Sequence, residues 1–96
     1  MEPAFEEVEV LPPPQAVVDG GDAEWAMLGA AVSRRLADMA EGEVLEIVSS
    51  ERRNRADVPA WCYLSGHDLV QMQIQGEVAR FWIKKVDRAR GGGDAR

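Results

Sequence analysis

The residues with the clearest chemical potential are the only cysteine, Cys62, the only histidine, His67, and Asp57 just before them. A thiol near a helix start can ionise to a nucleophilic thiolate, because the helix dipole and free N–H groups favour the anion. Asp57 is a good helix-start residue, since its carboxylate accepts from backbone N–H groups. Free cysteine is, however, among the most buried residue types. We therefore interpret Cys62 as a buried apolar residue and keep a reactive thiol as the alternative.

Other site chemistries find little support. We predict no metal site, because His67 has neither a second histidine nor a set of cysteine ligands beside it. We interpret His67 as a helix-end residue whose ring bonds a free carbonyl. No Ser/His/Asp order, phosphate-binding glycine loop or paired-carboxylate cleft is recognisable. The sequence thus predicts no cofactor and favours a protein that is not an enzyme.

Basic residues gather in two places, before the second predicted helix and along the last predicted strand. They are Arg52, Arg53 and Arg55 in the first group and Arg80, Lys84, Lys85, Arg88 and Arg90 in the second. A solvated surface is the simplest interpretation. Docking of an acidic protein or of RNA phosphates is the alternative, with Trp82 as the candidate for base stacking.

These residues need a scaffold, and the pattern predicts strands at 16–19, 44–49, 69–75 and 78–85 with helices at about 25–40 and 56–65. In the first helix the apolar positions recur at three- and four-residue steps: Trp25, Leu28, Val32, Leu36 and Met39. We expect Asp22 to cap this helix and Gly42 to end it.

The second helix should open at Asp57, with Pro59 in the first turn, where a missing N–H costs nothing. Trp61 and Leu64, together with Cys62, should share one side. Gly66 is the natural left-handed stop.

Gly76-Glu77 predicts the turn of a hairpin between the last two strands. Two helices can cover one face of a four-stranded sheet, so the other face meets water or a partner. Its apolar candidates are Trp82, Val78, Val44 and Val48.

Length and charge describe one small domain with an acidic leader. The chain has 96 residues and a net charge of −6, yet residues 1–24 hold seven acids and no base, and the remainder is nearly neutral. We expect a flexible Pro-rich leader at 1–15, a domain at 16–86 and a Gly/Arg tail at 87–96. No apolar run spans a membrane, and no signal peptide is recognisable, so the cytoplasm is the expected compartment.

The stretch Asp57-Val58-Pro59-Ala60-Trp61-Cys62 and the following Ser65-Gly66-His67-Asp68-Leu69 resemble the second half of the TusA/SirA family of small sulfur carriers. The resemblance runs roughly from Val17 to Lys85. It includes Gly42-Glu43-Val44-Leu45 and the closing Arg80-Phe81-Trp82-Ile83-Lys84-Lys85. It implies a two-layer α/β (α+β) sandwich, βαβαββ, with a four-stranded mixed sheet and two helices on one face.

The resemblance also implies a working thiol in a Cys-Pro-x-Pro motif at the start of the first helix. Counted back from Gly42-Glu43, that position falls on Trp25, and no cysteine precedes Cys62. The acidic residues Asp22 and Glu24 at the same helix start would repel a persulfide anion.

The sequence therefore favours a non-catalytic binding component, whose partner the resemblance assigns to sulfur-relay machinery. The expected docking surface is Trp82, Arg80, Lys84 and Val78, and a second copy of the chain is another candidate occupant. Two alternatives stay open: a sulfur carrier acting through Cys62, and an RNA-binding domain. The implied fold is also similar to the C-terminal domain of translation initiation factor three, which supports the second of these.

Overall fold

The computed structural model describes residues 13–87. They form, in order, β1 (Ala16–Asp19), α2 (Trp25–Ala37), β2 (Val44–Ser49), α3 (Asn54–Ser65), β3 (Asp68–Gln75) and β4 (Val78–Lys84). This βαβαββ order confirms the predicted fold. Most of the expected leader and tail, residues 1–12 and 88–96, lies outside the described residues, and the domain boundaries remain a prediction. Neither described helix is long and apolar enough to cross a bilayer.

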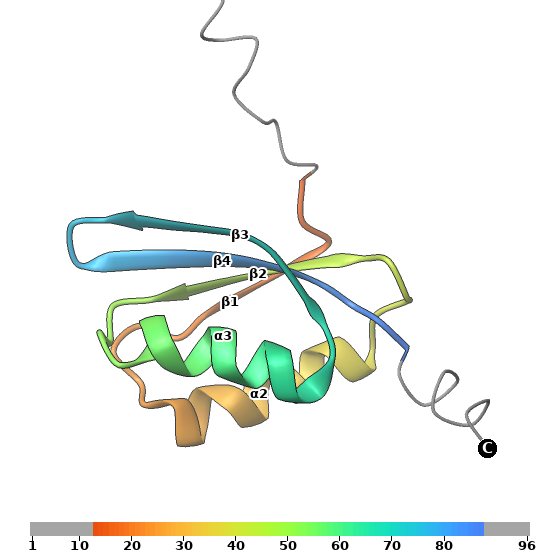
Figure 1. The fold of residues 1–96 in the computed structure, drawn as a ribbon, viewed down its shortest axis with the longest axis horizontal. Helices are drawn as coiled ribbons and strands as arrows, with labels where there is room; N and C mark the ends of the chain where they lie inside the picture. The colour runs from red at the N-terminus through yellow and green to blue at the C-terminus, as the bar shows by residue number, and fades with distance from the viewer. Residues whose placement is uncertain (1–12, 88–96) are drawn as a thin grey trace, which may run out of the picture.

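The four strands make one mixed sheet in the order β1-β2-β4-β3. β1 and β2 run parallel, as a crossover through α2 requires, and the other two pairs are antiparallel. Both helices lie on the same face of the sheet (Figure 1). The molecule therefore has one helical layer, one sheet layer and a sheet face that the helices leave open.

The core lies between these two layers. The central strands contribute Leu45, Ile47, Phe81 and Ile83, all fully buried. The helices contribute Leu28, Val32, Leu36, Val58 and Cys62, and Met39 is buried just beyond α2. The predicted stripe of the first helix is thus confirmed, with Trp25 half-buried at its start. Full burial of an aliphatic side chain stabilises a fold by about 1.5–3 kcal/mol, so this stripe fixes α2 to the sheet.

Helix α2 is shorter at its end than predicted. It stops at Ala37, not near Ala40, because the N–H groups of Asp38 and Met39 donate to carbonyls three residues back. The N–H of Ala40 then donates to the Glu43 carboxylate. Gly42, with a φ of 91°, lies in the turn before β2 and does not end the helix. The predicted cap at Asp22 is also wrong. Glu24 occupies the N-cap position, and its side chain caps no backbone N–H.

Helix α3 begins two residues earlier than expected, at Asn54, so Asp57 lies in the first turn and is not the cap. Pro59 is consequently inside the helix and not in its first turn, and it supplies no N–H to the carbonyl of Arg55. Gly66 ends the helix as predicted, with a φ of 86° and its N–H donating to the Cys62 carbonyl. The prediction for Leu64 is wrong, because this side chain is 76% exposed.

The hairpin alternates as its sequence indicates. Met72 lies opposite Phe81 on the helix-covered face, and Gln71 lies opposite Trp82 on the open face. A register shift between Leu69 and Gln71 marks a bulge in β3. Of the predicted open-face residues, Val48, Val78 and Trp82 are half-buried. Val44 is buried, so that part of the expected apolar surface is absent.

Candidate functional site at the starts of the two helices

Trp25 is the first residue of α2, and its indole is half-buried. The ring lies over Gly29 one turn later. A Cβ at Gly29 would lie 2.9 Å from the ring, so any residue other than glycine would displace the indole from this position. The ring also packs obliquely against Trp61 of α3, with ring centroids 5.5 Å apart. Trp25 therefore ties the start of α2 to the neighbouring helix.

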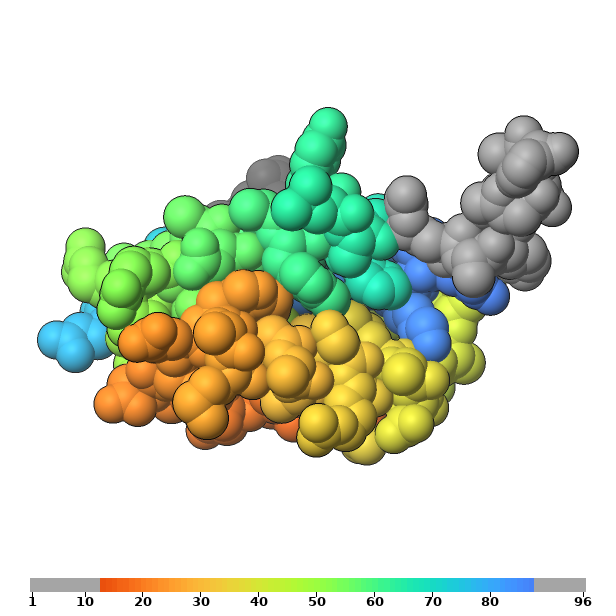
Figure 2. Space-filling model, turned by 90° about the horizontal axis from the view of Figure 1, so that it is seen from below, coloured from red at the N-terminus to blue at the C-terminus, as the bar shows by residue number. Residues whose placement is uncertain are grey.

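The aromatic contact continues along the outside of the helical layer. Trp61 packs against His67 at a centroid distance of 5.6 Å. Nδ1 of His67 accepts the N–H of Val86 at 3.0 Å, so the ring is held by the chain after β4. That this ring also bonds a free helix carbonyl stays a prediction. Figure 2 shows α2, in orange to yellow, packed alongside α3, in green, over this outer surface.

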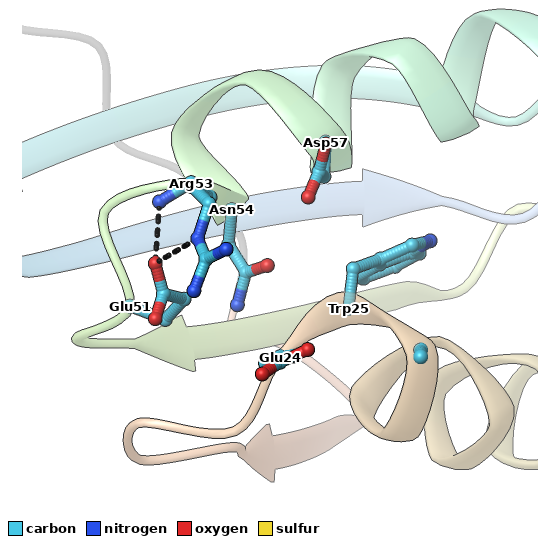
Figure 3. Close-up of a pocket in the computed structure, with 7 residues that line it drawn as sticks. Glu24, Trp25, Glu51, Arg53, Asn54 and Asp57 are labelled. Atoms are coloured by element: carbon cyan, nitrogen blue, oxygen red, sulfur yellow. Dashed lines mark hydrogen bonds and ion pairs between the residues drawn. The ribbon is translucent and has the colours of Figure 1, made fainter.

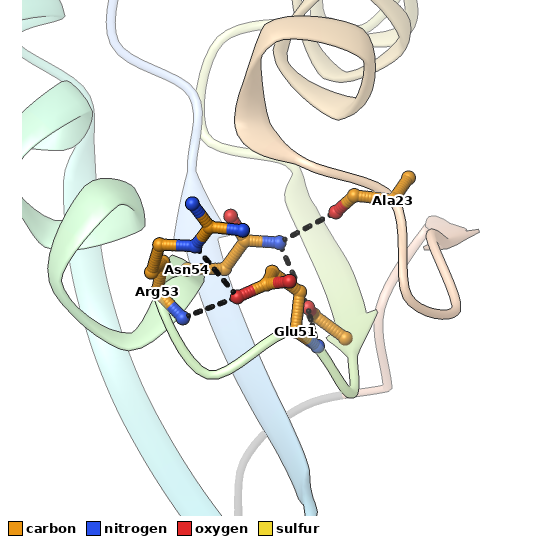
Figure 4. Close-up of polar contacts among 5 residues, drawn as sticks. Ala23, Glu51, Arg53 and Asn54 are labelled. Carbon is orange, nitrogen blue, oxygen red and sulfur yellow. Dashed lines mark hydrogen bonds and ion pairs between the residues drawn. The ribbon is translucent and has the colours of Figure 1, made fainter.

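The start of α3 is built by side chains that bond the backbone just ahead of them. The Ser49 hydroxyl accepts the N–H of Glu51, and Oε2 of Glu51 accepts the N–H of Arg53 at 2.8 Å. The same oxygen accepts from Nε of Arg53 at 3.2 Å. These contacts with Arg53 hold the pKa of Glu51 below its usual range. Glu51 and Arg53 are therefore a locally satisfied pair (Figure 4).

Asn54, the first residue of α3, is fully buried. Its Nδ2 donates to the carbonyl of Ala23 at 3.1 Å and to the Ser49 hydroxyl at 2.9 Å. These bonds connect α3 to the segment before α2 (Figure 4). Among the buried side-chain polar atoms of residues 13–87, Oδ1 of Asn54 is the one without a hydrogen-bond partner. A buried acceptor left unpaired costs about 1–3 kcal/mol.

A hollow of about 120 Å³ opens between the starts of α2 and α3 (Figure 3). It is lined by Glu24, Trp25, Ala26, Glu51, Arg53, Asn54 and Asp57. Three of these residues are acidic and one is basic. Both helix starts favour negative side chains through their dipoles, which accounts for carboxylates in this position. Within residues 13–87, no group of three His, Cys, Asp or Glu side chains is arranged to hold a metal ion.

Cys62 is not part of this hollow. It lies in the third turn of α3, is 3% exposed and packs in the core. Burial raises the pKa of its thiol to about 11, and the charge of Asp68 adds to the shift. At neutral pH the group is therefore a thiol and not a thiolate, which agrees with the favoured interpretation of a buried apolar residue.

Comparison with known proteins supplies the family. The sequence model described as "Sulfurtransferase TusA" matches residues 30–85, which is more than half of the chain. The chain belongs to the TusA family. The family model covers the sheet from β2 onward, all of α3 and most of α2. It begins after Trp25, so the start of α2 is outside the match.

Named relatives of this TusA-family chain are sulfur carriers. It is 31% identical over 51 residues to "Sulfur carrier protein TusA" of Pseudomonas paraeruginosa, covering 53% of this chain and 65% of that protein. It is 35% identical over 52 residues to "Putative sulfur carrier protein YrkF" of Bacillus subtilis, covering 54% and 28%. TusA of Pseudomonas putida aligns over 72 residues at 26% identity, covering 75% and 90%. The first two alignments thus span less than two thirds of those relatives.

Two of the three arginines in the first predicted basic group have partners within the protein. Arg53 is paired with Glu51, and Nη2 of Arg55 donates to the carbonyl of Gly76 at 2.9 Å, joining α3 to the hairpin turn. Arg52 is exposed. Only Arg53 of the three lines the hollow. These contacts assign Arg53 and Arg55 a local structural role.

The predicted surface on β4 is also less basic than its sequence indicates. Arg80 donates to the carboxylate of Glu46 at 2.8 Å, a pair that forms between β2 and β4. Lys84 is exposed, with Asp68 opposite it on β3. Trp82 lies between Glu46 and Gln71 in the sheet register. The charge of Arg80 is thus partly neutralised by Glu46, whereas Lys84 is exposed; Arg88 and Arg90 lie outside the described residues.

Sequence reasoning did not single out Asn54 or Glu51. The signal was available in Ser49-Ser50-Glu51, because Ser and Glu side chains just before a helix commonly bond its first N–H groups. Asn54 gave no such signal, since its role depends on the carbonyl of Ala23, 31 positions away in the chain.

Proposed function

We propose that this chain is a cytoplasmic accessory protein of a sulfur relay, which binds a partner protein and carries no sulfane sulfur itself. The observation that carries the proposal is the separation of thiol and helix start. Trp25 begins α2, whereas the chain's one thiol is buried in α3.

The chemistry of sulfur carriage supports this reading. A persulfide needs a thiolate to form it and an accessible position to pass it on. An indole does neither, and Glu24 beside it disfavours an anion. The family resemblance implies that the carrier thiol stands where Trp25 does. The relay is proposed from the relatives, which are named sulfur carriers.

The alternative, a carrier acting through Cys62, is less well supported. Its thiol is covered by the core, and its pKa is raised to about 11. Transfer to a partner would require α3 to open. The RNA-binding alternative is also less well supported, because Arg53, Arg55 and Arg80 have partners within the protein.

Sulfur loading tests the proposal directly. The protein is incubated with a cysteine desulfurase and cysteine, and in a second arm with a rhodanese-type donor, and its intact mass is then measured. We expect no stable gain of one sulfur atom, whereas a TusA relative with its Cys-Pro-x-Pro motif treated alike should gain one. A gain that is lost in Cys62→Ser would overturn the proposal in favour of the Cys62 carrier.

For the docking surface we propose the open sheet face around Trp82, with Val78, Arg80 and Lys84, and an acidic patch of a sulfur-relay protein as its occupant. Trp82 offers a large half-buried ring, and exposed Lys84 supplies a charge on the same face. Trp82→Ala should weaken binding to an immobilised cysteine desulfurase, and Lys84→Glu should slow association. Ser33→Glu, exposed on α2 and thus away from the open sheet face (Figure 1), is the control for added negative charge. Unchanged binding in both variants, or a change in self-association instead, would exclude this occupant.

A further inference from the structure

We infer that the hollow between the starts of α2 and α3 binds a guanidinium group, presented as an arginine side chain by the partner protein. The inference deepens the proposed function, on which the identification of a protein partner rests. Its physical basis is an acceptor-rich, acidic hollow with an aromatic side and one buried acceptor that lacks a donor.

The orientation of the Asn54 amide is fixed by its contacts. Nδ2 faces the carbonyl of Ala23, which can only accept, so a flipped amide would set two oxygens against each other. The remaining atom, Oδ1, is consequently committed as an acceptor, and it has no partner. In Figure 3 this oxygen is on the side of the amide that faces Trp25. A ligand that satisfies it must bring an N–H or O–H donor.

Charge decides which donor fits. Arg53 is engaged by Glu51, so Glu24 and Asp57 are the carboxylates of the hollow outside this ion pair. The bond to Glu51 is the main cause of the raised pKa of Arg53, and the charges of Glu24 and Asp57 are close enough to add to it. Helix starts ordinarily favour anions. Here three carboxylates already occupy that role, and a further anion would meet them at short range. A cationic donor is favoured instead.

Shape and size favour guanidinium over ammonium. The hollow of about 120 Å³ has room for more than a single water-sized group, which a planar guanidinium needs. Its planar set of N–H donors can serve Asn54, Asp57 and Glu24 together, whereas ammonium presents three donors from one point. Trp25 also lines the hollow, and an indole attracts a guanidinium held near its face.

Asn54 is buried, and Trp25 lines the hollow with it. The indole N–H of Trp25 and the side-chain amide of Asn54 are therefore the natural reporters. Methylguanidinium is titrated into the ¹⁵N-labelled full chain, and the three tryptophan indole signals and the Asn54 amide are followed by NMR. We expect saturable shifts of Trp25 and Asn54, with Trp82 on the open sheet face unmoved.

Two variants and a control localise the site. Glu24→Gln and Asp57→Asn should each weaken binding about tenfold, since each removes one charged acceptor. Asp38→Asn, at the other end of α2, removes the same charge from the same helix and should leave affinity unchanged. The dispersion of each spectrum checks that the variant is folded. Arginine blocked at both termini is a second probe, and tighter binding than methylguanidinium would indicate a side-chain ligand and not a free small cation.

Three results would overturn the inference: shifts that rise linearly at all three tryptophans, equal affinity in both acidic variants and the parent, or a saturable response to thiosulfate in place of guanidinium. The last would identify an anion site. The titration uses no partner and no sulfur donor. A failure here therefore leaves the sulfur-loading proposal standing, and a sulfur-loaded Cys62 would leave the guanidinium result standing.

Discussion

A sulfur carrier needs an accessible position and a thiol at the same place. In this protein the start of α2 has the first and the third turn of α3 has the second. The start of α2 is accessible and borders a hollow, but it carries Trp25. The third turn of α3 carries the thiol of Cys62, but the thiol is covered by the core and its pKa is raised. Both positions belong to helices on the same face of the sheet (Figure 1).

The comparison shows that sharing the fold does not by itself make a thiol reactive, because reactivity depends on where in the fold the thiol lies. A dipole at a helix start activates a thiol that is there, and it does nothing for a thiol two turns farther in. At the start of α2 the same dipole instead favours the carboxylates that surround the hollow. The positive end of α2 thus faces this protein's own carboxylates and not a thiolate.

The largest effect is expected from breaking the scaffold that holds both positions. Val32 is fully buried, so Val32→Asp places an uncompensated carboxylate in the core. We expect a loss of more than about 4 kcal/mol in the free energy of unfolding, with much of the protein unfolded. Circular dichroism and urea titration measure it. Ser33→Asp, one residue along on the exposed side of α2, is the control. A parent-like melting curve for Val32→Asp would show the helix placement to be wrong.

The next effect concerns the thiol. With a pKa of about 11 against an ordinary 9.0, the thiolate fraction of Cys62 near pH 8 is about 100-fold lower in the native protein than in the unfolded chain. Alkylation by iodoacetamide should be slower by at least that factor, and mass spectrometry with and without urea measures it. Equal rates would mean that the thiol is open to solvent.

The same pKa shift sets a pH dependence. Because the folded-state pKa lies above the unfolded value, the contribution of the protonated thiol to stability is complete below about pH 9.0 and is lost as the pH rises towards 11. In Cys62→Ser this component of the alkaline decline should disappear. Urea midpoints between pH 8 and 11 for both proteins provide the test.

Moving the thiol from position 62 to position 25 tests directly whether the start of α2 makes a thiol more reactive. In a Cys62→Ser background, Trp25→Cys should be alkylated at least about tenfold faster than native Cys62, because it is more exposed and lies at the positive end of α2. Adding Glu24→Gln should raise the rate again by removing a like charge. Ala31→Cys, exposed in the middle of α2, is the matched control. If positions 25 and 31 react equally, the helix start gives no activation.

The smallest effect is expected on the opposite sheet face. Glu46→Gln breaks the pair with Arg80, whose side chain is 42% exposed. Partly exposed pairs contribute about 1 kcal/mol or less, so a small loss of stability that shrinks in high salt is expected. Urea titration at two salt concentrations measures it. A large, salt-independent loss would contradict the view that this pair is a surface contact.

Periodicity predicted the fold well, because the apolar stripe of α2 and the alternation of the hairpin each reflect burial on one face. Helix ends were predicted less well. Asp22 and Asp57 are good capping residues by type, but α2 begins after a turn in which the N–H of Ala23 donates to the carbonyl of Gly20. The start of α3 follows a turn in which Glu51 accepts the N–H of Arg53. Such turns depend on loop geometry that residue types specify only in part.

The candidate site was predictable only in part. The resemblance directs attention to Trp25, and the structure puts Trp25 at the start of a helix. The hollow itself joins segments separated by some thirty positions through Asn54 and Ala23, a contact that neither segment signals. Likewise the sequence shows Arg80 as a free charge, since Glu46 meets it only once β2 and β4 pair.

Gly29 has a consequence for the motions of the molecule. A glycine inside a helix costs about 1 kcal/mol relative to alanine, and α2 also begins without a side-chain cap. The first turn of α2 therefore has the least intrinsic helical stability and depends on the indole resting on it. Local opening should start there, so the amide protons between Trp25 and Gly29 should exchange with solvent before those between Val32 and Leu36, where the side chains are buried. The wall of the hollow formed by α2 is thus the part of the helical layer that can open while the rest stays folded.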